Sequence, residues 1–232
     1  METYLILLIL AGMVAMDTTS GPQIFISEPI VSCSILGLLF GKPETGLIIG
    51  IFFQLFWLGY LPLGAVRLTD SNMAAFISSA SLFTAAEIFG FTDRILVAGI
   101  IPALLFGIAA GFVGLHLTTA VRQRNGRQSE IFLSRLEKDS IQSVSGWHMA
   151  GIGLSFLRGF LMALILVPLG AAVCGLTVLA PDLLIDSITL SAPVIWGAAC
   201  ASAVMIFVLR GKIIPLILGA VGGFIWILRG II

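Results

Sequence analysis

Charge is scarce in this chain. Charged residues occupy 10% of its 232 positions, whereas soluble domains carry about 25%. Hydrophobic residues make up 59% of the chain, and the mean hydropathy is +1.13. This composition excludes an ordinary soluble domain, so most of the chain must lie in lipid. The formal net charge is zero, which excludes the strongly basic surface of a nucleic-acid-binding protein.

The side chains that usually carry catalysis or bind metals are also few. The only histidines are His116 and His148, and neither has another ligand-type residue at helical spacing. The cysteines, Cys33, Cys174 and Cys200, lie in apolar segments without ligand spacing, and we expect them to be small buried hydrophobes. No Walker, metalloprotease, dinucleotide-binding or nucleophile-elbow motif is present. We therefore expect no metal, no cofactor and no catalytic centre.

Long apolar runs fill the rest of the sequence, but several do not fit a plain membrane crossing. The first is short and lacks the basic start of a signal peptide, so we expect it to be retained. The second contains Glu28-Pro29, and the third holds Gln54 and runs into a proline and a glycine. Short, interrupted segments are typical of broken helices or re-entrant hairpins. The apolar runs lie at about 3–16, 24–40, 46–63, 72–90, 95–119, 147–180, 187–209 and 213–228.

These patterns predict an all-α, polytopic integral membrane protein with broken or re-entrant helical hairpins and about 6–9 membrane segments. We expect a single membrane domain over residues 1–232. The run at 147–180 is longer than one crossing and is either one kinked helix or two pieces. Small residues four apart predict close helix packing at Gly46/Gly50, Gly107/Gly111 and Ala110/Gly114.

One long polar segment, at about 121–146, interrupts the apolar runs. It holds five of the chain's 12 basic residues, so the positive-inside rule places it in the cytoplasm. We expect a basic loop, which either includes a short amphipathic surface helix beginning near Ser129 or is a solvated linker. Its basic residues are Arg122, Arg124, Arg127, Arg135 and Lys138.

Gln54 is the most informative polar residue, because it lies in the middle of an apolar run. A primary amide in lipid costs free energy unless protein, water or ligand answers it. Its carbonyl and its amide could both hydrogen-bond a sugar hydroxyl; alternatively, the amide links two helices. Asp70 and Asn72 also have two readings. They belong either to the N-cap and first turn of a helix or to a cavity lined by Gln54.

Four further ionisable residues are candidate supporting groups. Arg67 either neutralises Asp70 or reaches the membrane interface. Glu28 needs a partner, water or the membrane edge, and Arg158, near the middle of an apolar run, needs a carboxylate in the bundle. His148 opens a crossing from the cytoplasmic side, where a structural role is more common than a functional one.

The order of these residues resembles a known family. Residues 28–50, with a proline, a Cys-x-x-x-Gly and a Thr-Gly-x-x-x-Gly, are similar to the N-terminal signature of one class of permease subunit. That class is the membrane subunit IIC of the mannose/fructose/sorbose family of the sugar phosphotransferase system (PTS). The pattern continues through Gln54 and a Gly-Ala turn to Asp70. After the polar segment, a Trp-His pair and Arg158 resemble a later part of the family pattern.

This resemblance implies a permease subunit that moves a hexose across the bacterial inner (cytoplasmic) membrane and is itself no enzyme. It implies a hetero-oligomer with an IID membrane subunit, with soluble IIA and IIB carriers supplying the phosphoryl group. Gln54 stands where the family has a sugar-binding glutamate, and Asp70 at the acidic position of its turn. With Asn72, these are the expected sugar-binding residues. The chain departs from the pattern at Gln54 and at the acidic Glu28, where the family has a basic residue.

Two other readings stay open. The neutral Gln54 is compatible with a degenerate IIC-like subunit that acts as a sensor or scaffold without transporting. An ion-coupled secondary transporter would need more intramembrane carboxylates with clear partners than Glu28, Asp70 and Glu87 provide.

Overall fold

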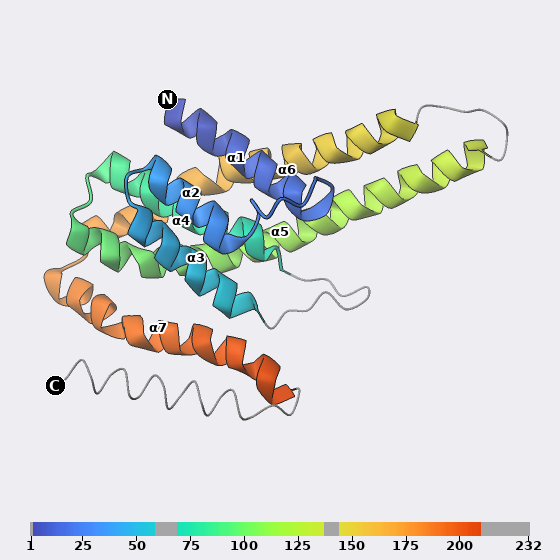
Figure 1. The fold of residues 1–232 in the computed structure, drawn as a ribbon. Coiled ribbons are helices and arrows are strands. Elements are labelled where there is room, and N and C mark those ends of the chain that lie inside the picture. Colours follow the sequence, from blue (N-terminus) through green and yellow to red (C-terminus); the bar gives the residue numbers. More distant parts are fainter. Residues whose placement is uncertain (1, 59–68, 137–143, 210–232) are drawn as a thin grey trace.

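The computed structural model describes residues 2–58, 69–136 and 144–209, and these ranges contain helices and no strand (Figure 1). The predicted all-α fold is thereby confirmed for the described part of the chain. In chain order the elements are α1 (Glu2–Thr19), α2 (Pro29–Leu39), α3 (Pro43–Trp57), α4 (Ser71–Phe89), α5 (Asp93–Leu136), α6 (Val144–Gly175), the short 3₁₀-helix η1 (Leu176–Leu179) and α7 (Asp182–Leu209).

Helices α2 and α3 form a short hairpin. Each begins with a proline, Pro29 or Pro43, in the first turn, where a missing N–H leaves no hydrogen bond unmade. Gly41 turns the chain between them with a φ of 68°, a left-handed conformation that favours glycine. With 11 and 15 residues, the helices are about 17 and 23 Å long, shorter than the roughly 30 Å hydrocarbon core. Neither is long enough to cross alone, as the interrupted apolar runs predicted.

Glycines bring neighbouring helices into backbone contact. A Cβ atom on Gly46 of α3 would lie 2.3 Å from the carbonyl oxygen of Cys33 in α2. A Cβ on Gly50 would lie 2.8 Å from the α2 backbone. On α5, a Cβ on Gly107 would lie 2.7 Å from the carbonyl oxygen of Ala74 in α4. The close packing predicted from the spacing of small residues is confirmed at these positions, where only glycine fits.

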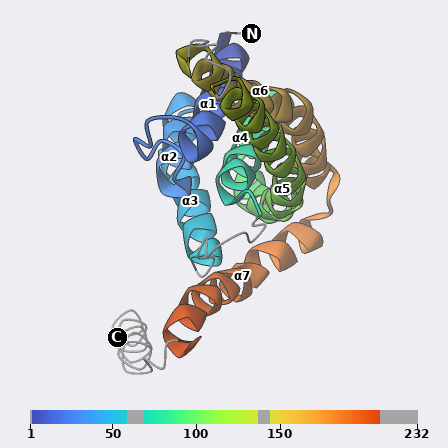
Figure 2. The same ribbon diagram turned by 90° about the vertical axis from the view of Figure 1, so that its right-hand side faces the viewer.

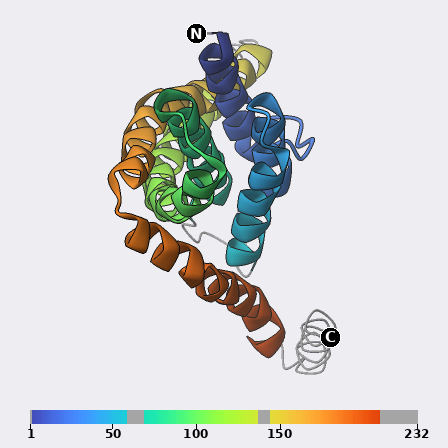
Figure 3. The same ribbon diagram turned by 90° about the vertical axis from the view of Figure 1, so that its left-hand side faces the viewer.

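Helix α4 is the buried centre of the bundle. Helices α1, α2, α3, α5 and α6 pack against it, and Figures 2 and 3 show it enclosed by its neighbours. Its residues Ser78, Ser79 and Ser81 are fully buried, and the Ser79 hydroxyl donates back to carbonyl oxygens of its own helix. Helix α7 contacts α3 and α5 and lies obliquely across one side of the bundle (Figure 2).

Three stretches are long and apolar enough to span a membrane: Ser71–Phe89, Asp93–Ser134 and His148–Leu179. The chain is therefore a multi-pass membrane protein. The run at 147–180, expected to be one kinked helix or two pieces, is one helix with Pro168 inside, followed by η1.

Cys33 and Cys174 are buried as expected, but the expectation for Cys200 is wrong. Cys200 lies on α7, which packs on the bundle from one side only and leaves this thiol exposed.

The polar segment at 121–146 is not a loop over most of its length. Helix α5 runs without interruption from Asp93 to Leu136, and α6 begins at Val144; residues 137–143 lie outside the described residues. Hydropathy falls near residue 120, but arginine, glutamine, glutamate and leucine make up most of the following residues and favour a helix, so the helix outlasts its apolar part despite Gly126. Figure 1 shows this end of α5 extending beyond the bundle beside the start of α6. We call residues 120–136 the arm.

Candidate functional site

The hydrogen bonds of the predicted site residues form three groups. Asp70 and Arg158 belong to one buried cluster, Asn72 bonds to the end of α1, and Gln54 bonds to Glu28 on the α2–α3 hairpin. Arg67 lies outside the described residues. His148 is exposed near the start of α6, in a groove that residues 125–133 of the arm also line.

Asp70 is the N-cap of α4. Its Oδ1 accepts a hydrogen bond of 3.2 Å from the backbone N–H of Met73, which satisfies a helix-end donor. Its own N–H donates to the carbonyl oxygen of Gly111 on α5 at 3.1 Å. A Cβ on Gly114, one turn further, would lie 2.6 Å from the Asp70 Cβ, so the glycines of α5 allow this approach. The capping reading of Asp70 is confirmed.

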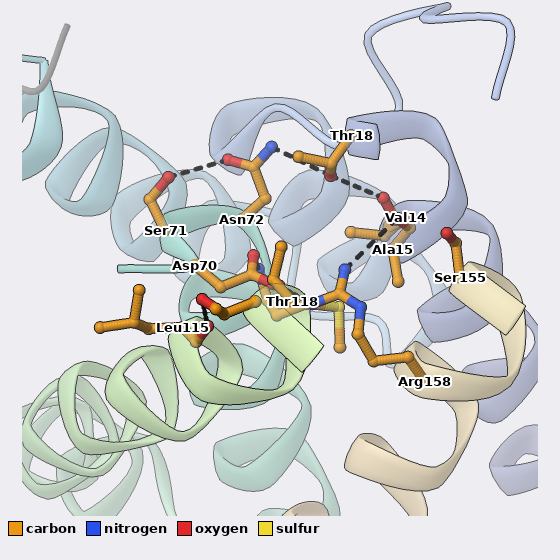
Figure 4. Close-up of polar contacts among 12 residues, drawn as sticks. Val14, Ala15, Thr18, Asp70, Ser71, Asn72, Leu115, Thr118, Ser155 and Arg158 are labelled. Carbon is orange, nitrogen blue, oxygen red and sulfur yellow. Dashed lines mark hydrogen bonds and ion pairs between the residues drawn. The ribbon is translucent and has the colours of Figure 1, made fainter. Parts of the chain in front are cut away.

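Arg158 is the buried partner of Asp70. Its Nη1 forms an ion pair with Asp70 Oδ2 and also contacts the hydroxyl of Thr118, which itself donates to Asp70 Oδ2 at 3.1 Å. The Arg158 Nη2 donates to the carbonyl oxygen of Ala15 on α1 at 3.4 Å. Arg158 and Asp70 are only 6% and 8% exposed. One ion pair thus joins α1, α4, α5 and α6 (Figure 4).

The contacts of the Asp70 carboxylate limit its chemical role. Both of its carboxylate oxygens already accept hydrogen bonds from protein groups, and Oδ2 accepts from two side chains. Breaking a buried pair of this kind leaves an uncompensated charge and costs about 3–5 kcal/mol. In this structure Asp70 holds the helices together and orients the start of α4, rather than presenting a free carboxylate.

Asn72 lies two residues after Asp70, in the first turn of α4, and reaches the end of α1. Its Nδ2 donates to the hydroxyl of Thr18 at 3.4 Å, and its Oδ1 accepts from Ser71 at 3.1 Å. The Thr18 hydroxyl in turn donates to the carbonyl oxygen of Val14 at 2.9 Å. Figure 4 shows this chain of contacts beside the ion pair. Asn72 is half-buried, so part of its surface stays accessible.

Gln54 and Glu28 form the pair on the hairpin. The Gln54 Nε2 donates to Glu28 Oε2 at 2.9 Å. Glu28 occupies the N-cap position of α2, but its side chain does not cap the helix and turns to Gln54 instead. No arginine, lysine or histidine among the described residues forms an ion pair with Glu28. The Gln54 Oε1 is buried without a hydrogen-bond partner in the described structure.

The two interpretations of Gln54 apply to different atoms of its amide. The nitrogen links two helices, as intramembrane amides often do. The oxygen has no hydrogen-bond partner in the described structure, so the sugar-binding interpretation stays open for it. A buried acceptor left unpaired costs about 1–3 kcal/mol. Together, Gln54 and Glu28 offer hydrogen-bond acceptors and one negative charge at a place in the hairpin where the apolar run is interrupted.

Several residues of the site carry no signal that stands out in the sequence. Thr118, Thr18 and the Ala15 carbonyl group lie in or beside apolar runs and look like ordinary helix residues. Asp17 is different, because a carboxylate directly after an apolar run is a visible anomaly. It is 2% exposed and accepts hydrogen bonds from the segment between α1 and α2.

Comparison with known proteins shows the family. A family model described as "PTS system sorbose-specific iic component" matches residues 2–225. The chain belongs to this family. The resemblance inferred from the sequence motifs is confirmed, and it extends over nearly the whole chain rather than over the matched motifs alone.

Individual relatives of this IIC chain carry three sugar names. The sorbose-specific EIIC component of Lacticaseibacillus casei is 42% identical over 52 residues, covering 22% of this chain and 19% of that protein. The mannose-specific EIIC component of Escherichia coli K12 is 26% identical over 138 residues, 60% of this chain and 48% of that protein. The fructose permease IIC component of Bacillus subtilis is 32% identical over 95 residues, 41% of this chain and 31% of that protein. The matches thus span half or less of these relatives' lengths.

Solved structures agree on the fold of the IIC chain. One described as "Structure of membrane protein" aligns with a TM-score of 0.63 at 21% identity, covering 100% of this chain and 96% of that one. The complex of the mannose transporter ManYZ with microcin E492 contains a chain that aligns with a TM-score of 0.57 at 19% identity, covering 99% and 95%. Both alignments run over nearly the full length of each chain, so the likeness concerns the fold as a whole.

Proposed function

We propose that this chain is the sugar-translocating IIC subunit of a mannose-family phosphotransferase system in the bacterial cytoplasmic membrane. The observation that carries the proposal is the Gln54–Glu28 pair on a hairpin too short to cross the membrane, in a chain of this family. Polar groups at such interruptions are typical of substrate sites in transporters. The substrate is a hexose, whose hydroxyl groups donate to these acceptors.

In this proposal the sugar meets acceptors from two elements. The Gln54 Oε1 and the Glu28 carboxylate come from the hairpin, and Asn72 comes from the first turn of α4. The Gln54 oxygen is closed off in this structure, so the hairpin has to shift before a hydroxyl reaches it. Asp70, whose oxygens are occupied, orients the start of α4 and acts on the sugar through Asn72.

The Glu28 carboxylate also bears on the non-transporting alternative. That alternative rested on a neutral glutamine where the family has a glutamate. Here a carboxylate stands 2.9 Å from the Gln54 nitrogen, so the pair as a whole keeps an acidic group. A charged acceptor makes hydrogen bonds roughly twice as strong as a neutral one does. The site therefore retains the chemistry that sugar binding needs, and transport is the better supported function.

Partners follow from the same proposal. The chain would form a hetero-oligomer with an IID membrane subunit, and soluble IIA and IIB carriers would bring the phosphoryl group. Arg122, Arg124 and Arg127 are exposed on the arm, which makes this rigid extension a docking surface for an acidic face of the IIB carrier. The IIC chain itself moves the sugar, and phosphoryl transfer takes place on the soluble partner.

Uptake of labelled sugar by cells that carry the complete set of subunits tests the proposal. The probes are mannose, fructose and sorbose, and Gln54→Ala is compared with the parent chain at equal amounts in the membrane. We expect uptake and phosphorylation of the transported sugar to fall at least about tenfold, because two hydrogen-bonding groups of the site are lost. Unchanged uptake and phosphorylation in Gln54→Ala would remove this site from consideration.

A further inference from the structure

The end of α1 contacts two groups of the candidate site directly and reaches the third through the connection to α2. The carbonyl oxygen of Ala15 accepts from Arg158, and the Thr18 hydroxyl accepts from Asn72. Between them, Asp17 holds the segment that leads to Glu28. Three different parts of the site are thus tied to one turn of one helix.

Asp17 makes a specific set of contacts. Its Oδ1 accepts from the backbone N–H of Ile24 at 2.7 Å, and its Oδ2 accepts from the N–H of Ser27 at 3.1 Å and the Ser27 hydroxyl at 2.8 Å. Each donor belongs to the connection between α1 and α2. A buried charge is tolerated where it is this fully hydrogen-bonded, and its removal leaves buried N–H groups without acceptors.

The segment that Asp17 holds is strained. Gln23 and Phe25 have φ angles of 54° and 66°, although neither is glycine. Left-handed backbone at such residues costs about 1–3 kcal/mol each and persists only where the surroundings enforce it. Asp17 accepts from Ile24, which lies between the two strained positions, and from Ser27, two residues after the second, so its carboxylate bonds directly to the strained segment.

Glu28 follows directly on this segment. It comes one residue after Ser27, and its N–H donates to the carbonyl oxygen of Phe25 at 3.1 Å. The Glu28 side chain then accepts from Gln54. A short, continuous path of bonds therefore runs from the Asp17 carboxylate through Ser27 to Glu28 and Gln54.

We propose that Asp17 is a positioning residue for sugar binding: it holds the strained connection of residues 20–28 so that Glu28 meets Gln54. This inference rests on the proposed function of the Gln54–Glu28 pair. Asp17 itself contacts no sugar and acts through Glu28. When the Asp17 bonds open, the connection can relax and the hairpin is released from the end of α1.

The experiment combines amide hydrogen exchange with transport kinetics, using the full chain together with its membrane partner. In Asp17→Asn one carboxylate oxygen becomes an NH2 group, which donates and cannot accept, so the N–H of Ile24 or of Ser27 loses its acceptor. We expect exchange over residues 24–28 to speed up and the KM for sugar, per transporter in the membrane, to rise about tenfold. Leu7→Ala is the matched control, because Leu7 is fully buried on the same helix. It should lower the amount of protein and leave KM unchanged.

A double-mutant cycle separates positioning from general destabilisation. If Asp17 acts through Glu28, the double variant Asp17→Asn/Glu28→Gln should have almost the same KM as Glu28→Gln alone. The proposal is overturned if the KM effects of the two substitutions simply add, or if the amides at 24–28 stay protected in Asp17→Asn. Absence of any sugar uptake by the parent chain would refute the proposed function instead, and the exchange of these amides would still decide whether Asp17 holds the connection.

Discussion

Arg158 on α6 forms a buried ion pair with Asp70, the residue that caps α4, and Thr118 on α5 contacts both. The two charged residues are 88 positions apart in the sequence. Since the Arg158 guanidinium also reaches the Ala15 carbonyl oxygen on α1, this contact fixes the relative placement of the helices around the candidate site.

Removal of either charge should destabilise the bundle. In Asp70→Asn or Arg158→Ala the remaining partner is a buried, uncompensated charge, with an expected loss of about 3–5 kcal/mol. Thermal unfolding of the purified protein in detergent measures the effect. Arg94→Ala is the control, since the ion pairs of Arg94 with Asp182 and Asp186 are exposed and should contribute only about 0–1 kcal/mol. Equal shifts for Arg94 and Arg158 would contradict the role assigned to the buried pair.

Exchanging the two groups of the hairpin pair tests its charge. Gln54→Glu places a second carboxylate beside Glu28 and should raise the KM for sugar, because like charges this close repel. The double exchange Glu28→Gln/Gln54→Glu restores one carboxylate and one amide and should recover most of the uptake. Initial rates of labelled sugar uptake over a range of concentrations give both KM values. A double exchange that is worse than Gln54→Glu alone would mean that the pair does not work as a unit.

Close packing of the hairpin predicts a steep penalty at Gly46. The Cβ of Gly46→Ala would approach the Cys33 carbonyl oxygen to 2.3 Å, so the hairpin must open and the protein should lose about 1–3 kcal/mol. Gly126→Ala on the arm is the control, since a Cβ there meets nothing within 4 Å. An alanine at that helical position should stabilise by roughly 0.5–1 kcal/mol. Thermal midpoints of the two variants should therefore move in opposite directions.

The arm should govern partner binding rather than sugar binding. Replacement of Arg122, Arg124 and Arg127 by glutamate reverses the charge of its exposed surface and should weaken binding of the soluble IIB carrier by at least about tenfold. Binding assays at two salt concentrations measure this, because screening weakens an electrostatic contact. Arg94→Glu, at the opposite end of α5, is the control for an added negative charge. If the arm variant binds the carrier normally, the docking surface lies elsewhere.

The sequence predicts those structural features that depend on residues close together in the chain, such as helix lengths, close packing at glycines and helix caps. Short, interrupted apolar runs predict helical hairpins that do not cross the membrane, and glycines four apart predict their close packing. The position of Asp70 and Asn72 before an apolar run allows a helix cap. The partner of Arg158 cannot be predicted, because two residues that meet from distant helices have no characteristic separation in a single sequence. The helical arm was mistaken for a loop, since hydropathy reports where lipid contact ends and says little about where a helix ends. Asp17 stands out in the sequence as a carboxylate directly after an apolar run, but its role cannot be predicted, because two of its three donors are backbone N–H groups that any sequence would supply.

The length of the arm determines how far a partner bound to it can lie from the apolar part of α5. The 17 residues of the arm, positions 120–136, add about 25 Å of helix beyond the apolar part. That is close to the diameter of a small domain, about 30 Å. In the proposed docking, a carrier of about that size would lie along nearly the whole arm, with Arg122, Arg124 and Arg127 on the half nearer the apolar part. If the proposed docking holds, the arm would keep such a partner close to the headgroup level, where the sugar emerges.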